Sequence, residues 1–150
     1  MKKKRVVIIS LLLLLVSVIG ISSYFLFKDK INLLDVDHSA VDWNGKKQKD
    51  TSGEENTIAI PGFEKVTLYA NETTQAVNFH NPEINDCYFK ISLIHPDGSV
   101  LWISDLIEPG KGMYSIELEK TLAVGEYENA VLKYECFSLN DQSPLNGSEI

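Results

Sequence analysis

The most constraining feature of the sequence is a run of 22 uncharged residues, positions 6–27, which follows Lys2, Lys3, Lys4 and Arg5. An α-helix of that length spans about 33 Å, enough to cross a hydrocarbon core of about 30 Å. The only polar side chains in the run, apart from the tyrosine hydroxyl near its end, are serines, whose hydroxyls can bond back to the helix backbone. The run therefore predicts a transmembrane helix over 6–27.

The basic residues 1–5 set the expected orientation of this helix. Positively charged flanks stay in the cytoplasm, so residues 28–150 are expected outside the membrane. The alternative is a cleaved signal peptide, which would place the rest of the chain outside as well. Signal peptides have 7–15 apolar residues and a small-residue cleavage site, so the longer run favours an uncleaved signal anchor.

Residues 28–57 are expected to form an extracytoplasmic tether. The second half, NGKKQKDTSGEENT, is too polar to bury much surface, whereas the apolar residues of the first half could lie against a domain. Asp35, Asp37, His38 and Asp42 raise the idea of a metal site. The remaining ligand positions of a calcium loop are missing, so a solvated linker is favoured and no metal is expected.

Residues 58–150 are expected to form one all-β domain. Short segments of alternating apolar and polar residues recur there, separated by turns such as Pro96-Asp97-Gly98. The predicted strands are 58–60, 65–70, 75–80, 87–95, 99–104, 113–119 and 126–139. Seven short antiparallel strands favour an immunoglobulin-like β-sandwich, with a small barrel as the alternative.

A local motif supports the sandwich. Residues 122–127, LAVGEY, have the L-x-x-G-x-Y form found where a strand enters an immunoglobulin-like sheet. By that resemblance Tyr127, with Gly125, would pin a tyrosine corner. A competing match is the spacing Cys87, Trp102, Tyr134-Glu135-Cys136, which would give Trp102 the core position; the two matches conflict, and the LAVGEY corner is preferred.

The two cysteines, Cys87 and Cys136, both fall on apolar strand faces. The expected compartment permits oxidation, so the two alternatives for these cysteines are a disulfide and a pair of buried free thiols. Buried thiols are favoured.

Charge and motifs exclude several functions. Residues 6–150 carry 10 lysines and arginines against 21 acidic residues, which argues against binding nucleic acid. No nucleophile elbow, P-loop, zinc motif or paired CxxC occurs, so we expect no cofactor and no enzyme. The most distinctive loop holds Asn78, His80, Asn81 and Asn85, a candidate binding loop whose asparagines suit a structural turn better.

Several short stretches carry a resemblance to known proteins. They are VDWNG at 41–45, IPGF at 60–63, NP at 81–82 with CYF at 87–89, IEPGK at 107–111 and GEY at 125–127. Together they resemble small, mostly uncharacterised extracytoplasmic proteins of Gram-positive bacteria, some found near mobile elements. The resemblance implies location and fold, and no activity.

These observations predict a surface-displayed, non-catalytic module that binds a protein partner. Its candidate patch comprises Tyr69, Tyr88, Trp102 and Met113. The alternative is a structural subunit of an envelope complex, which pairs through the edge near residues 143–150, where one more strand is expected to begin.

Overall fold

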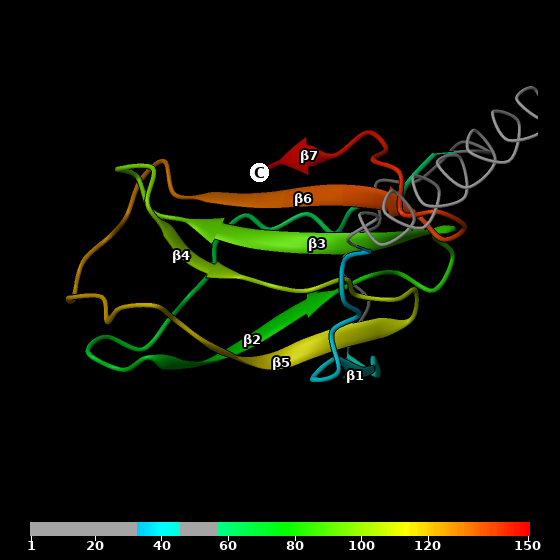
Figure 1. The fold of residues 1–150 in the computed structure, drawn as a ribbon. Coiled ribbons are helices and arrows are strands. Elements are labelled where there is room, and N and C mark those ends of the chain that lie inside the picture. The colour runs from blue at the N-terminus through cyan, green and yellow to red at the C-terminus, as the bar shows by residue number, and fades with distance from the viewer. Residues whose placement is uncertain (1–32, 46–56) are drawn as a thin grey trace, which may run out of the picture. The chain divides into compact units, whose positions relative to one another are not determined.

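The described part of the chain comprises residues 33–45 and 57–150 of a computed structural model, and it folds into two antiparallel β-sheets (Figure 1). The larger sheet has the order β4-β3-β6-β7, and the smaller has the order β1-β5-β2. The strands are β1 (Val41–Asp42), β2 (Thr74–His80), β3 (Cys87–Ile94), β4 (Val100–Ile103), β5 (Lys111–Glu117), β6 (Val131–Ser138) and β7 (Ser148–Glu149). The predicted all-β fold with about seven antiparallel strands is therefore confirmed.

The core lies between the two sheets. The alternation of β3 turns Cys87, Phe89, Ile91 and Leu93 inward, and each is at most 5% exposed. The smaller sheet contributes Phe79, Met113 and Ile116 to the same core. The ring of Trp102 on β4 lies 5.8 Å from that of Phe79 on β2, and this contact joins the sheets. Trp102 is 8% exposed and lies in the core.

Two predicted strand segments do not form strands in the described chain, and a third is shorter than predicted. Residues 58–60 and 65–70 have no ladder, and the last long strand begins at Val131 instead of residue 126. Side chains of residues 65–70 still alternate between exposed and half-buried, as the sequence pattern requires. The alternation fixed which face is buried, but a strand also needs a neighbour with which to share hydrogen bonds.

The beginning of the described chain packs on the domain. Val41 and Asp42 of β1 pair with β5, and Val36 forms a parallel bridge to Leu106. The Gln142 side chain bonds both the N–H and the carbonyl of Leu34. Residues 34–150 consequently form one unit. Residues 34–45 of the predicted tether thus lie against the domain, and residues 28–32 and 46–56 lie outside the described residues.

Trp43 anchors this N-terminal segment. Its ring stacks on His80 at 3.9 Å with an interplanar angle of 10°, and its Nε1–H donates to Asn78 Oδ1 at 2.8 Å. The Asp42 carboxylate forms an ion pair with Lys111, and Asp37 accepts hydrogen bonds from Ser39 and Asp105. These carboxylates hold the segment on the domain.

The predicted membrane helix, residues 6–27, lies outside the described residues. Within 33–45 and 57–150 no helix is both long and apolar enough to span a bilayer.

The two cysteines lie on neighbouring strands of one sheet as free thiols. Cys87 pairs with Ser138 in the β3–β6 ladder and Phe89 with Cys136, so the thiols sit diagonally across the same face. The neighbouring Cys87 thiol and burial both raise the pKa of Cys136. An immunoglobulin disulfide joins two sheets, so this arrangement removes the competing Cys-Trp-Tyr-x-Cys match.

Tyr134 on β6 offers a test of the core. Its side chain is fully buried, its ring meets Phe89 edge to face, and its hydroxyl has no hydrogen-bond partner among the described residues. Burial raises the pKa of this phenol. We expect Tyr134→Phe to increase the free energy of unfolding by about 1 kcal/mol, because it removes an unsatisfied buried polar group. Urea unfolding of both proteins measures this, and a loss of stability would reveal a partner for the hydroxyl.

Candidate binding groove

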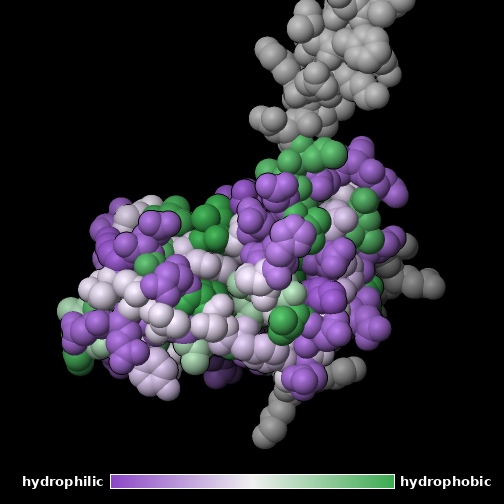
Figure 2. Space-filling model, turned by 60° about the horizontal axis from the view of Figure 1, so that its bottom comes forward, coloured by the Kyte–Doolittle hydropathy of each residue, from purple (hydrophilic) through white to green (hydrophobic). Residues whose placement is uncertain are grey.

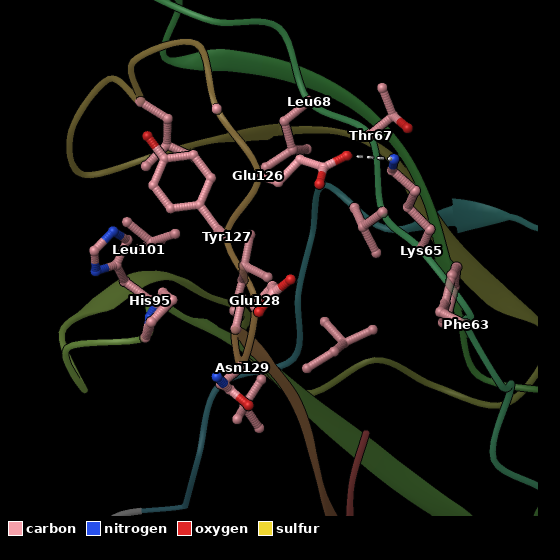
Figure 3. A pocket seen from close by; sticks show the side chains of 18 of the residues that line it. Phe63, Lys65, Thr67, Leu68, His95, Leu101, Glu126, Tyr127, Glu128 and Asn129 are labelled. Atoms are coloured by element: carbon pink, nitrogen blue, oxygen red, sulfur yellow. Dashed lines mark ion pairs between the residues drawn. The ribbon is translucent and has the colours of Figure 1, made fainter.

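A groove of about 710 Å³ lies beside the core, at the side of the domain where the predicted strands failed to form (Figure 3). One wall is the segment 63–70 and the other is the segment 122–131. Leu93, Leu101 and Leu132, each at most 5% exposed, contribute its apolar floor. Half-buried side chains of the walls, including Val66, Leu68, Leu122 and Tyr127, extend this apolar lining.

The rim of the groove is acidic. Among its lining residues, three carboxylates (Glu64, Glu126 and Glu128) accompany one lysine, Lys65. Figure 3 shows Lys65 and Glu126 joined between the two walls, with 3.7 Å between Nζ and Oε1. Both side chains are largely exposed, so the pair contributes little stability and can open without large cost.

Both walls carry backbone groups without protein partners. Within the described residues, no backbone N–H or carbonyl of residues 63–68 is hydrogen-bonded. Likewise, no backbone N–H of residues 123–129 donates to any described group. Two rows of open main-chain donors therefore line one groove.

Tyr127 lies in the second wall. Its hydroxyl donates to the carbonyl of Ala123 at 3.0 Å, which is the backward bond that the LAVGEY motif suggests, and Gly125 lies within the loop so closed. The ring also contacts His95 at 5.3 Å. Tyr127 lies four residues before β6 starts, so it braces the groove wall and does not stand at a strand entry.

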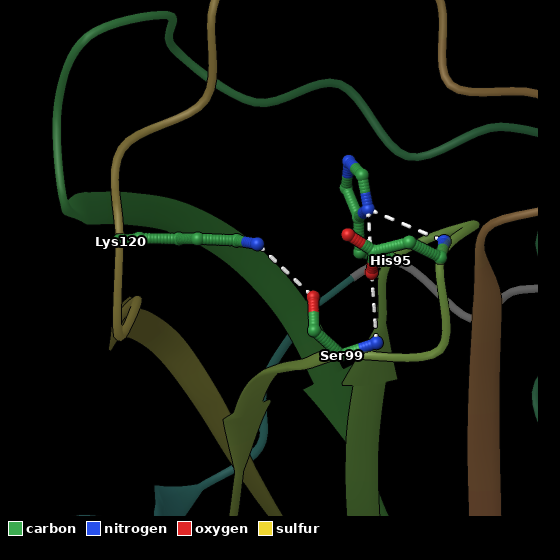
Figure 4. A network of polar contacts seen from close by, with 4 residues as sticks. His95, Ser99 and Lys120 are labelled. Carbon is green, nitrogen blue, oxygen red and sulfur yellow. Dashed lines mark hydrogen bonds and ion pairs between the residues drawn. The ribbon is translucent and has the colours of Figure 1, made fainter.

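The β3–β4 hairpin borders the groove and is braced by a polar network (Figure 4). Asp97 Oδ1 lies 2.9 Å from His95 Nδ1 and accepts from the Ser99 N–H at 2.8 Å. The Ser99 hydroxyl accepts from Lys120 Nζ at 3.0 Å. Ser99, His95 and Asp97 thus brace the hairpin turn, and the Ser99 hydroxyl is engaged by a lysine.

This network predicts a pH dependence. Hydrogen bonds from Ser99, and then from His95, hold the pKa of Asp97 well below its usual 3.8. A lowered folded-state pKa contributes stability above pH 3.8 that is lost progressively as the pH falls below it. We expect Asp97→Asn to melt below the wild type at pH 7, and the difference to shrink below pH 3.8. Thermal melts from pH 7 to 3 measure this. The Asp86→Asn control removes a carboxylate without a hydrogen bond or ion pair in the described residues, and an equal effect there would contradict the assignment.

The residues of the predicted binding loop lie close together, but their side chains point into the domain. Asn81 and Asn85 are buried, and their amides bond to each other and to backbone groups of Ala59, Cys87 and Ile107. His80 lies under Trp43, and Asn78 accepts from Trp43. These residues hold the fold together.

The predicted aromatic patch is wrong for two of its four residues. Trp102 and Met113 are 8% and 5% exposed, whereas Tyr69 is exposed and Tyr88 half-buried. A register shift between Ala76 and Phe79 places Met113 opposite Phe79, in the core, and leaves Tyr114 exposed. Figure 2 shows apolar areas scattered among polar ones on the face it presents.

Sequence reasoning missed the groove, although its signal was present. Residues 65–70 and 126–130 were predicted to lie in strands, and both form groove walls. In comparisons with known proteins, no family model, no curated protein and no solved structure matches this chain.

Proposed function

We propose that this chain is a membrane-anchored module, displayed outside the cell membrane, that binds a protein partner through the groove between residues 63–70 and 122–131. The observation that carries the proposal is the groove itself, which combines a buried apolar floor, an acidic rim and open main-chain groups. Apolar floors with polar rims are typical of binding sites. The uncharged run at 6–27 supports the location.

The strand order supports an immunoglobulin-like assignment within this proposal. β3 lies between β4 and β6, β7 follows at the edge, and β2 pairs with β5 in the other sheet. Immunoglobulin-like sandwiches pair their strands in this order. In such folds binding residues collect on loops at the ends of the sandwich or on free edges, which matches the position of the groove.

A second candidate function is a structural subunit of an envelope complex. The observation that favours it is the short edge strand β7, whose Ser148 and Glu149 pair with β6. Edge strands offer unpaired groups to a neighbouring subunit. Crosslinks confined to β7 residues would favour this alternative.

The location is tested with Thr67→Cys in the full chain. Thr67 is exposed on the groove wall, whereas the native thiols Cys87 and Cys136 are buried. A membrane-impermeant maleimide should label the variant in intact cells and leave the wild type unlabelled. Labelling that requires cell lysis would contradict an extracytoplasmic domain.

Partner binding is tested by photo-crosslinking in cells. A photoreactive amino acid at Thr67 should give a discrete adduct with one protein, whereas the same group at Ile84, 70% exposed and outside the groove lining, should not. Identical adducts from both positions, or none from either, would overturn the groove as the binding site.

A further inference from the structure

The groove wall formed by residues 63–70 has a property that a general apolar pocket lacks. Residues 65–70 have the residue alternation of a strand, yet they have no ladder partner in the described chain. In the opposite wall, residues 128–129 form a turn and Asn129 has a φ of 64°, so that wall is not extended. Val66 and Leu68 face inward while Lys65 and Thr67 face outward, as in an edge strand. The wall at residues 63–70 is thus prepared as a strand and lacks the neighbour that would complete it.

The neighbouring strand β7 gives the direction in which a missing strand would run. β7 is antiparallel to β6, and the N–H and carbonyl of Ile150 both bond to Leu132. Ile150 itself lines the groove. A segment that prolongs the line of β7 would therefore pass Val131 and enter the groove between its two walls.

From this geometry we propose that the groove is a strand acceptor, filled by an extended segment of the partner protein that adds as a strand beside residues 63–68. Main-chain hydrogen bonds to the open walls would provide affinity, and alternate side chains would provide specificity. This proposal rests on the proposed function and specifies how the partner binds.

The charges of the groove define the chemistry of the added segment. Its inward residues would meet Leu93, Leu101 and Leu132, so they are apolar. Its outward residues would meet a rim of three carboxylates with a single lysine, so they are basic. The expected ligand is an extended peptide that alternates valine or isoleucine with lysine or arginine.

The test uses the full chain in detergent and a fluorescent peptide of sequence KVKIKVR, measured by anisotropy. We expect saturable binding, which an N-methylated version of the same peptide loses at least about tenfold. N-methylation removes main-chain donors and leaves every side chain in place, and a strand contributes several such bonds. Equal binding of the two peptides would overturn strand addition.

Two variants locate the interaction. Thr67→Pro removes an N–H that is free in the structure, so it should weaken peptide binding about tenfold and leave the melting temperature close to that of the matched Thr67→Ala. Glu126→Lys combined with Glu128→Lys should weaken binding several-fold at low salt, and much less at 1 M salt, where charges are screened within about 3 Å. Unchanged binding by both variants would place the peptide elsewhere and overturn the proposal.

The outcomes separate this inference from the proposed function. If Thr67 crosslinks a partner in cells but the peptide does not bind, strand addition is overturned and the groove remains the binding site. If no crosslink forms, the proposed function itself fails. If the full chain sediments as a dimer that Thr67→Pro dissociates, the added strand comes from a second copy, which overturns the assignment to a separate partner.

Discussion

Replacing Asn81 by alanine is expected to lower the free energy of unfolding by about 3 kcal/mol. The Asn81 amide donates to the carbonyls of Cys87 and Ile107 at 2.8 and 2.9 Å, and its Oδ1 accepts from Asn85 at 2.8 Å. Asn81 is fully buried, so water cannot replace these bonds after truncation. Leaving buried polar groups unsatisfied is among the largest costs of a single substitution.

Asn85 extends this network to the groove wall. Its amide bonds both the N–H and the carbonyl of Ala59, at 2.8 and 2.9 Å, and so holds the start of the segment that leads to residues 63–68. Because Asn81 and Asn85 share a bond, the double alanine variant should lose about 1 kcal/mol less than the two single losses added together. The groove wall is therefore coupled to the core through two amides.

Urea unfolding of the single and double variants measures these effects, with Asn146→Ala as the control. Asn146 is exposed and its side chain makes no hydrogen bond with described residues, so its replacement should change stability by less than about 0.5 kcal/mol. A loss at Asn81 no larger than at Asn146 would refute the structural role assigned to the amide network.

The sequence predicted the strands whose residues alternate cleanly between apolar and polar. Residues 87–94 alternate cleanly, and the structure has β3 there with the predicted buried face. Period-2 alternation is a local property that survives whatever the tertiary context. For the same reason it could not show that residues 65–70 lack a neighbour, because a neighbour comes from elsewhere in the chain or from another chain.

Other features could not be predicted from local sequence patterns. The two-residue strand β1 exists because Val41 and Asp42 meet β5 some 70 positions later, and two residues have no readable period. The register shift at Ala76 and Phe79 exchanged the faces of Met113 and Tyr114. Trp43, a large aromatic beside a polar stretch, was the signal that could have indicated docking of residues 34–45.

The candidate site, too, could be predicted from the sequence only in part. Asparagines at 81 and 85 suited a turn and a binding loop equally well, and only burial separated the two roles. The acidic charge of the body was readable, but its concentration at the groove rim required the walls to meet. Residue types thus predicted the kind of surface, and tertiary structure decided where it lies.

Replacing Gly112 by alanine should cost about 2–3 kcal/mol and release the N-terminal segment from the domain. Gly112 lies on β5 between β1 and β2, opposite Val41 on one side and His80 on the other. An added Cβ would come within 2.8 Å of Trp43 Cδ1 and 2.9 Å of the Phe79 carbonyl oxygen. The Phe79 carbonyl belongs to a strand backbone and is fixed in place. The added methyl group must therefore displace the Trp43 ring, and the stacking of that ring on His80 is lost.

The matched control is Gly62→Ala, since an added Cβ at Gly62 meets nothing within 4 Å. That variant should be neutral or slightly more stable, because alanine restricts the unfolded chain. Urea unfolding reports the loss of stability, and limited proteolysis near residue 45 reports release of the segment. Equal stability and equal cleavage in the two variants would show that β1 does not depend on the close approach at Gly112. A selective loss at Gly112 would show that the packing of Trp43 contributes to holding residues 34–45 on the domain.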